Sequence, residues 1–153
     1  MSVTIRKATE DDTEIVYNYI RQLAEYKNMS NICTITISEL YNLLFDEKSL
    51  RALIVENSGE AVGMATYFYF RVSAFSGKRV LYIEDMFIEE KFRAQGIGTH
   101  LFEFLRTVAK ERNCLRMEWK CLNWDSPTIS FYEKMGGRIS DGWLTYTLES
   151  EHF

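Results

Sequence analysis

The stretch VLYIEDMFIEEKFRAQGIGTHLFEFLRTV, residues 80–108, decides how this chain folds and where its function lies. It begins as a strand, residues 80–88, and ends with the apolar spacing of an amphipathic helix from Ile97 onward. Between them lies a short turn, Arg93 to Gly98, with two glycines where the helix starts. Such a turn leaves backbone N–H groups unpaired at the positive end of the helix dipole. The turn therefore predicts an anion site that suits a pyrophosphate.

Two glycines are compatible with several phosphate-binding motifs, and their spacing argues against two of these. A Rossmann turn needs a third glycine and an acidic residue about 20 residues further on, and the third glycine is missing here. A P-loop needs Gly-Lys followed by Ser or Thr, which is also absent. What remains is Arg/Gln-x-x-Gly-x-Gly after an acidic, aromatic strand. Taken alone, the same residues are also compatible with a plain turn at the start of a helix.

The composition is that of an ordinary globular protein, and 153 residues predict one domain, residues 1–153. No apolar run approaches the length of about 20 residues that crosses a bilayer, and no signal peptide precedes the first strand, so we expect a cytoplasmic protein without a membrane partner. The formal net charge of −4 argues against nucleic-acid binding and favours a cationic ligand. The three cysteines form no CxxC pair, which indicates neither a disulfide framework nor a metal site.

The patterning along the chain predicts an α/β domain with a mixed sheet. The expected elements are a strand at 3–8, helices at 10–27 and 38–45, strands at 50–56, 61–70 and 79–88, a helix at 97–112, a strand at 115–121, a helix that Ser126 caps and Gly136-Gly137 ends, and closing strands within 138–148. The Ser58-Gly59 pair predicts a hairpin between two of the strands. Because a helix crosses between them, the strand at 115–121 should run parallel to the strand at 79–88.

Several short motifs follow one another along nearly the whole chain. They are Ile5-Arg6-Lys7-Ala8-Thr9, Leu23-Ala24-Glu25-Tyr26, Leu81 to Phe87, Arg93 to Gly98, Trp124 to Tyr132 and Gly142-Trp143. With these motifs the chain resembles the GNAT superfamily of N-acetyltransferases, and within it the diamine (spermidine/spermine) N1-acetyltransferases. The resemblance implies an α/β (α+β) fold with a mixed, mostly antiparallel twisted sheet of about six to seven strands and about four flanking helices. It also implies acetyl-CoA as co-substrate, and a homodimer with the C-terminal strands near the partner.

The resemblance assigns roles to individual residues. Tyr132 matches the family's general acid and Glu84 its substrate-binding acid. The acetyl-CoA contacts would come from Met86, Phe87, Ile88, Arg93, Ala94, Gln95, Gly96, Ile97, Gly98, Thr99, Asp125, Ser126 and Thr128, of which Arg93 to Thr99 hold the pyrophosphate. The amine pocket would include Tyr26, Glu84, Glu118, Trp119 and Asp141.

The chain departs from the diamine enzymes at two of these places. In those enzymes a glutamate follows the tyrosine that Tyr26 matches, whereas this chain has Lys27. A cation there would repel the tail of a polyamine. The family's asparagine before the fourth helix is Asp125 here, which places a negative charge near the cofactor arm.

The chemistry of acetyl transfer explains why these residue types are needed. A free alkylamine has a pKa near 10.4, so only about one molecule in a thousand is neutral and nucleophilic at pH 7. A carboxylate can bind the ammonium and accept its proton. Glu84 and Asp85 are adjacent on a strand and should point to opposite faces, so only one is expected to face the cleft, and the resemblance selects Glu84.

The thioester side needs an oxyanion site and a proton donor. Backbone N–H groups near Phe87 would stabilise the oxyanion, and the hydroxyl of Tyr132 would protonate the departing thiolate. No protein nucleophile is required, so we expect direct attack in a ternary complex rather than an acyl-enzyme on Cys114 or Cys121.

Three alternatives remain open at this stage. The amine could be a polyamine, another diamine, a lysine analogue such as thialysine, or a protein amine. The chain could also be a non-catalytic module that binds acyl-CoA. From the residues alone, Tyr132 could be a core tyrosine and Glu84 an ion-pair partner.

Overall fold

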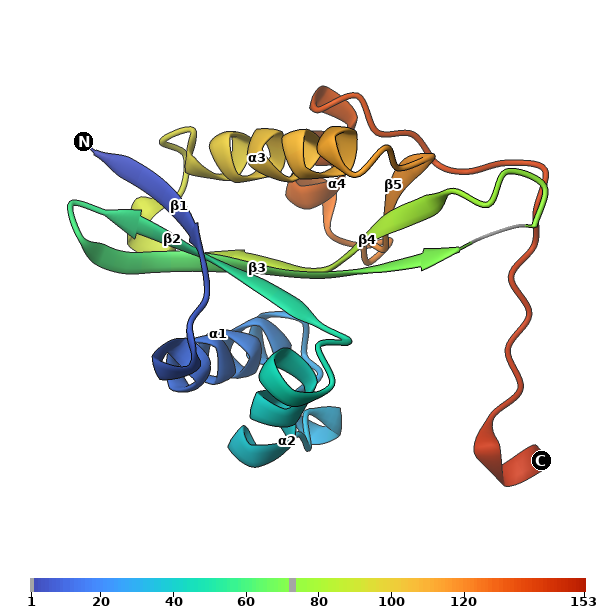
Figure 1. Ribbon diagram of the computed structural model, residues 1–153, viewed down its shortest axis with the longest axis horizontal. Helices are drawn as coiled ribbons and strands as arrows, with labels where there is room; N and C mark the ends of the chain where they lie inside the picture. The colour runs from blue at the N-terminus through green and yellow to red at the C-terminus, as the bar shows by residue number, and fades with distance from the viewer. Residues whose placement is uncertain (1, 72–73) are drawn as a thin grey trace. The chain divides into compact units, whose positions relative to one another are not determined.

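The computed structural model describes residues 2–71 and 74–153 (Figure 1). Its contacts divide the chain into two compact units, residues 1–122 and residues 123–153. The expected single domain over 1–153 stays a prediction. The first unit contains the sheet and three of the helices, and the second contains the remaining helix, α4 (Ser126–Lys134).

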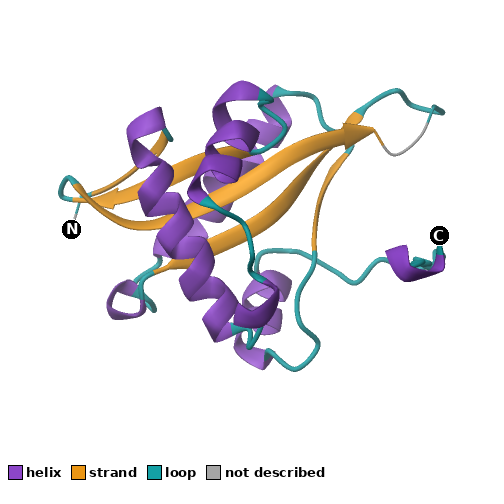
Figure 2. Ribbon diagram, turned by 90° about the horizontal axis from the view of Figure 1, so that it is seen from below, coloured by secondary structure: helices purple, strands orange, loops and turns teal. Residues whose placement is uncertain are grey.

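The first unit is built on a mixed sheet of five strands in the order β1-β2-β3-β4-β5 (Figure 2). The strands are β1 (Val3–Lys7), β2 (Arg51–Asn57), β3 (Glu60–Arg71), β4 (Arg79–Ile88) and β5 (Arg116–Trp119). Neighbours pair antiparallel except β4 and β5, which are parallel, so the predicted crossover is confirmed. The predicted hairpin is confirmed too, because Ser58 and Gly59 both have positive φ, 54° and 87°, as a two-residue type I′ turn requires.

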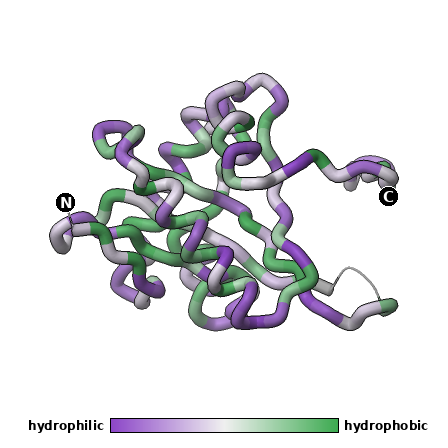
Figure 3. The backbone as a smooth tube through the Cα atoms, turned by 90° about the horizontal axis from the view of Figure 1, so that it is seen from above, coloured by the Kyte–Doolittle hydropathy of each residue, from purple (hydrophilic) through white to green (hydrophobic). Residues whose placement is uncertain are grey.

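Helices cover both faces of this sheet. α1 (Thr13–Tyr26) and α2 (Ile37–Tyr41), which continues as a π-helical turn over Asn42–Asp46, lie on one face, and α3 (Ile97–Glu111) lies on the other (Figure 1). Short 3-10 turns occur at Glu10–Asp12, Ser30–Ile32, Glu90–Phe92 and Ser150–His152. Figure 3 shows that the strands in the middle of this unit are largely hydrophobic, as strands covered on both faces must be.

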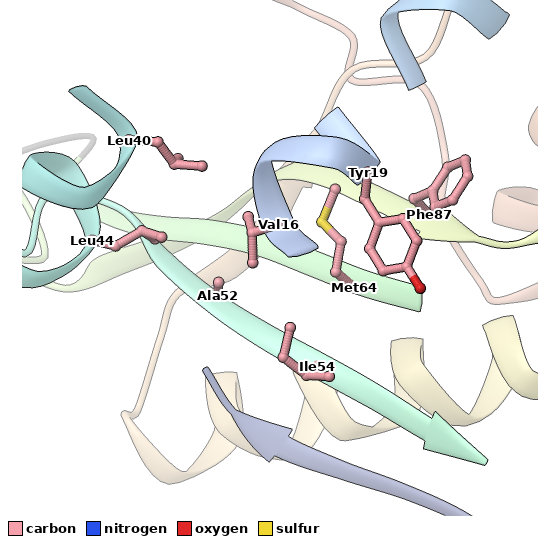
Figure 4. Close-up of a cluster of buried hydrophobic side chains, with 8 residues drawn as sticks. All are labelled: Val16, Tyr19, Leu40, Leu44, Ala52, Ile54, Met64 and Phe87. Atoms are coloured by element: carbon pink, nitrogen blue, oxygen red, sulfur yellow. The ribbon is translucent and has the colours of Figure 1, made fainter. Parts of the chain in front are cut away.

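The core beneath α1 and α2 is a cluster of buried apolar side chains (Figure 4). Its members are Val16, Tyr19, Leu40, Leu44, Ala52, Ile54, Met64 and Phe87. The ring of Tyr19 lies 5.1 Å from that of Phe87, and its hydroxyl donates a 2.7 Å hydrogen bond to Glu89 Oε1. Each large apolar side chain contributes about 1.5–3 kcal/mol by leaving water. The cluster therefore fixes α1 against the C-terminal half of β4.

The structure corrects three of the expectations. The sheet has five strands rather than six or seven, because residues 138–148 form no strand in the described structure. A strand needs a neighbouring strand to pair its backbone N–H and C=O groups. The side chains of this segment are not packed, as the 88% exposure of Trp143 shows. The helix expected at 10–27 begins with the Glu10–Asp12 turn, and Asp125 rather than Ser126 is the N-cap of α4.

An ion pair joins β1 to the start of α1. Arg6 donates from Nη1 and Nη2 to the two carboxylate oxygens of Asp12, at 2.7 and 3.0 Å, and from Nε to Glu56 at 3.0 Å. Asp12 is buried and also accepts from the backbone N–H of Thr9 at 2.7 Å. Through this bidentate contact, the carboxylate organises the turn that leads from the sheet into α1.

Replacing Asp12 with Asn should lower the free energy of unfolding by about 1–2 kcal/mol at neutral pH, because the charged hydrogen bonds from a half-exposed Arg6 are lost. Arg6 holds the pKa of Asp12 below its usual value. This contribution is therefore fully present above the pKa of an unfolded aspartate, about 3.9, and disappears as the pH falls through the lower folded pKa. Urea unfolding at pH 7 and pH 2 measures it, with the exposed Asp11→Asn as control. An equal difference at both pH values would contradict this assignment.

Candidate active site

The pairing of β4 with β3 is interrupted at one residue. Thr66 pairs with Asp85, but the next residue of β3, Tyr67, pairs with Ile83, so Glu84 is left without a partner. This is a β-bulge, which bends the strand and redirects side chains. The bulge lies in the part of β4 that faces α1 and α2.

A pocket of about 350 Å³ opens beside this bulge. Its lining residues are Ile20, Ile35, Leu40, Leu43, Ser49, Leu50, Glu84 and Asp85. The expectation that only one of the two acids would face the cleft is wrong, because the strict alternation of a regular strand does not hold across a bulge. The pocket is therefore lined mostly by apolar side chains, together with two adjacent carboxyl groups.

The two carboxyl groups hold protons more tightly than free ones. Burial raises the pKa of Glu84, although one side of it is open to solvent, and the charge of Asp85 raises it further. Burial also raises the pKa of Asp85, against the 2.8 Å hydrogen bond that it accepts from Thr66 Oγ1. Lys27 opposes both shifts, and Lys120 opposes that of Glu84. A carboxylate with a raised pKa is a stronger base and can accept a proton from a bound cation.

The end of β4 leads to the predicted anion turn, where the side chain of Arg93 folds back on the sheet. Its Nε donates a 2.7 Å hydrogen bond to the carbonyl oxygen of Ile88. Its guanidinium carbon lies 5.5 Å from the centre of the Phe87 ring and 5.8 Å from that of Tyr26, at the end of α1. Three of the predicted site residues, Tyr26, Phe87 and Arg93, are thus brought together.

The rest of the turn offers backbone groups. Ala94 and Gly96 have positive φ, 59° and 81°, and Gly96 is the N-cap of α3 without a side-chain cap. The first N–H groups of a helix have no partner within the helix. A Cβ added to Gly96 would meet no atom within 4 Å, so the space in front of the turn is open. The turn from Arg93 to Thr99 therefore fits an anionic group such as a pyrophosphate.

Two predicted pocket residues on β5 have contacts of their own. The carboxylate of Glu118 accepts a 2.6 Å hydrogen bond from Nε of Arg116. Trp119 packs edge-on against Phe102 of α3, with ring centres 5.4 Å apart. Their role toward an amine stays a prediction.

The second unit contains the other predicted site residues. Asp125 caps α4, because its carboxylate accepts from the backbone N–H of Thr128 at 3.4 Å and from the Thr128 hydroxyl at 2.8 Å. Ser126 is the first residue of the helix. Tyr132 is half-buried on α4, with its ring centre 5.4 Å from that of Phe131. Asp141 is exposed in the segment that follows.

The sequence reasoning missed the pocket role of Asp85 and its hydrogen bond from Thr66. Periodicity places Asp85 on the opposite face, and no residue of the strand marks the bulge that overrides it. The only signal was the adjacency of two acids in an otherwise apolar strand. The apolar walls of the pocket come from α1, from α2 with its π-helical turn, and from the residues just before α2 and β2, and the sequence did not mark them as a pocket.

Residues 17–137 match the model of the Acetyltransferase (GNAT) family. The chain belongs to the GNAT acetyltransferase family. As a member of this family it is an N-acetyltransferase. The chain is 31% identical over 161 aligned positions to thialysine N-epsilon-acetyltransferase of Sus scrofa, and the alignment covers 98% of this chain and 94% of the relative. It is 27% identical to spermidine/spermine N(1)-acetyltransferase-like protein 1 of Homo sapiens, over 96% of this chain and 22% of that protein. The predicted resemblance is confirmed.

The GNAT fold is confirmed by solved structures. A possible acetyltransferase from Clostridium difficile 630 superposes with a TM-score of 0.83 at 19% identity, over 97% of this chain and 98% of the other.

Among residues 2–71 and 74–153, no group of three or more His, Cys, Asp or Glu side chains is arranged to hold a metal ion. In the same described ranges, no helix is long and apolar enough to cross a membrane.

The cap of α4 yields a prediction about stability. Replacing Asp125 with Ala should lower the free energy of unfolding by about 1 kcal/mol, because the N–H of Thr128 loses its acceptor. Asp125→Asn keeps an acceptor oxygen and should lose only a small part of this. Urea unfolding followed by circular dichroism measures both. If the two variants were equally destabilised, the charge rather than the cap would be what matters.

Proposed function

We propose that this protein transfers the acetyl group of acetyl-CoA to a primary amine of a small cationic substrate, by direct attack in a ternary complex. The observation that carries the proposal is the two-acid pocket at the β4 bulge. The same strand leads, through residues 89–96, to the open N-terminus of α3. A site for an ammonium and a site for a pyrophosphate are thus built on one continuous strand, turn and helix.

The residues proposed to hold acetyl-CoA are those that the family resemblance assigns. Bound acetyl-CoA supplies the thioester that the amine attacks. The backbone N–H groups of Arg93 to Thr99 bind its pyrophosphate, and the main chain of Met86, Phe87 and Ile88 lies along its acetyl and pantetheine portion. On α4, Asp125, Ser126 and Thr128 contact the pantetheine arm. The carboxylate of Asp125 accepts hydrogen bonds as a helix cap, and this supports an aspartate at the position where the family has asparagine.

Side chains of this protein then accept the proton of the substrate ammonium and donate a proton to the thiolate. Glu84 binds the substrate ammonium and, directly or through water, accepts its proton, which its raised pKa favours. N–H groups near Phe87 stabilise the oxyanion, and Tyr132 donates a proton to the departing thiolate. Burial raises the pKa of Cys114, so that its thiol stays protonated, which supports direct attack over an acyl-enzyme. Tyr26, Glu118, Trp119 and Asp141 complete the amine pocket.

The proposed assembly is a homodimer that forms through the C-terminal segment. Leu144, Tyr146 and Leu148 alternate as one face of a strand would, yet Leu144 is 80% and Tyr146 87% exposed. Exposed apolar side chains in such a pattern favour pairing with a second copy. Sedimentation of the wild type and of a Tyr146→Asp variant would show a dimer and a monomer, respectively.

The net charge of −4 supports the absence of a nucleic-acid partner.

The direct test of the activity is a panel of amines with acetyl-CoA, followed by release of free thiol. Spermidine, a diamine, thialysine and a lysine-containing peptide should be included, and at least one small amine should accelerate thiol release. If none does while CoA binds tightly, the protein is an acyl-CoA-binding module. If only the peptide does, its substrate is a protein amine.

Tyr132→Phe should lower kcat by about 100-fold or more, because general acids contribute about 10²–10⁴ in rate. The affinity for CoA, measured by calorimetry, should stay within about twofold, because the phenol is needed only as the thiolate departs. The neighbouring Phe131→Leu variant controls for packing. A parallel loss of turnover and CoA affinity in Tyr132→Phe would make this residue structural.

A further inference from the structure

The ring of Tyr69, near the end of β3, is surrounded by three arginine side chains. The guanidinium carbons of Arg51, Arg79 and Arg112 lie 5.5, 5.7 and 5.9 Å from the centre of this ring. Arg51 is the first residue of β2, Arg79 is the first residue of β4, and Arg112 directly follows α3. Three separate elements thus bring their positive charges to one place, which we call the arginine cluster.

The arginine cluster is separate from the sites proposed above. α3 begins at the anion turn and runs for 15 residues before it reaches Arg112. A helix rises about 1.5 Å per residue, so Arg112 lies roughly 22 Å along the helix axis from that turn. Figure 1 shows that α3 runs from the turn toward the end of the sheet where β4 begins, on the face opposite to α1 and α2. The cluster therefore belongs neither to the acetyl-CoA turn nor to the acid pocket.

The three guanidiniums have no carboxylate partner among residues 2–71 and 74–153. The ion pairs of arginines within 4.0 Å in these ranges involve Arg6, Arg106 and Arg116 instead. Carboxylates are not scarce, because the chain has 22 acidic residues against 18 lysines and arginines. All three side chains of the cluster are exposed. The cluster is thus a local excess of positive charge on the surface of an acidic protein.

Stacking on Tyr69 is the simpler explanation for the cluster. A guanidinium over an aromatic ring gains about 0.5–1 kcal/mol at an exposed site. A ring has only two faces, however, so at least two of the three guanidiniums share one face. Like charges this close repel each other, which offsets part of the gain. Stacking alone therefore explains one or two of these arginines better than it explains all three.

The donors of the cluster match a phosphoryl group. Each guanidinium presents a planar fork of N–H groups that fits two oxygens of a carboxylate or a phosphate. One such fork is enough for a single carboxylate. A phosphate monoester has three acceptor oxygens and a charge of about −1.5 to −2 at pH 7, which suits several forks at once. The net charge of −4 opposes the long-range attraction of nucleic acids and anionic membranes, which favours a small ligand.

We propose that Arg51, Arg79 and Arg112 bind the phosphoryl group of a small phosphorylated molecule, at the end of the sheet remote from the acetyl-CoA turn. The bound anion connects the starts of β2 and β4 to the end of α3 and cancels the repulsion among the arginines. This site is independent of the proposed acetyl transfer, because it uses no residue of the acetyl-CoA or amine sites.

Pyrophosphate is the probe, titrated by calorimetry onto protein saturated with CoA so that the anion turn is already occupied. Wild type should bind one equivalent. Arg51→Gln, Arg79→Gln and Arg112→Gln should each weaken this binding by about tenfold, the effect of losing one charged hydrogen bond. Arg112→Lys keeps the charge without the fork and should fall between wild type and Arg112→Gln. The control Arg106→Gln removes an equal charge from α3, where Arg106 pairs with Glu103, and should stay within about twofold of wild type.

NMR of the arginine side chains locates the bound anion without relying on any variant. Pyrophosphate should shift the Nε–H signals of Arg51, Arg79 and Arg112 and leave that of Arg106 unchanged. Malonate, which carries two carboxylates and no phosphoryl group, should bind at least about tenfold more weakly, because it offers fewer charged hydrogen bonds to the three forks.

Four outcomes would overturn the assignment. They are no binding of pyrophosphate to the wild type, binding that shifts none of the three signals, affinity that all three glutamine variants leave intact, and malonate that binds as tightly as pyrophosphate. Vesicles with anionic lipid should not retain the protein at physiological salt. Retention on such vesicles without pyrophosphate binding would make the cluster a membrane contact and would refute the small-molecule site.

Discussion

The pairing of β3 with β4 is the constraint on which the functional site depends. The pairing of β4 with β3 is regular on both sides of Glu84 and is interrupted at that residue. Both ends of β4 are therefore held in the sheet, while the side chains at the bulge do not alternate between its two faces. If the pairing were regular, Asp85 would turn away from Glu84, and the pocket would have a single acid. The core around Tyr19 and Phe87 in turn fixes α1 on the C-terminal half of this strand. The acid pair, the pocket wall and the anion turn thus share one rigid support.

The negative charges of Glu84 and Asp85 are only partly offset by the groups around them. Two carboxyl groups in one pocket repel each other, and burial disfavours the charge of both. The hydroxyl of Thr66 and the ammonium of Lys27 offset only part of this, which leaves both carboxyl groups with raised pKa values. A bound ammonium would supply the missing positive charge. This repulsion is the physical basis of the proposed preference for a cationic substrate.

The sequence allowed much of this structure to be predicted, and the misses have physical causes. The strand, turn and helix over residues 80–108, the Ser58-Gly59 hairpin and the parallel crossover follow from local rules, because glycine, turn geometry and periodicity act over a few residues. The bulge at Glu84 could not be predicted, since it reflects a mismatch between two strands rather than a property of either. Asp125 was passed over as a cap because Ser126-Pro127 gives an equally strong local signal one residue later. The residues of the proposed acetyl-CoA and amine sites came from the family resemblance, not from the patterning.

The exposed strand pattern in residues 143–148 has a consequence for the life of the newly made chain. Trp143 and Tyr146 are largely exposed on a segment that forms neither helix nor strand, which is the kind of segment that proteases cut and that identical copies join into aggregates. In the isolated chain this segment is therefore open to proteolytic cleavage and to self-association.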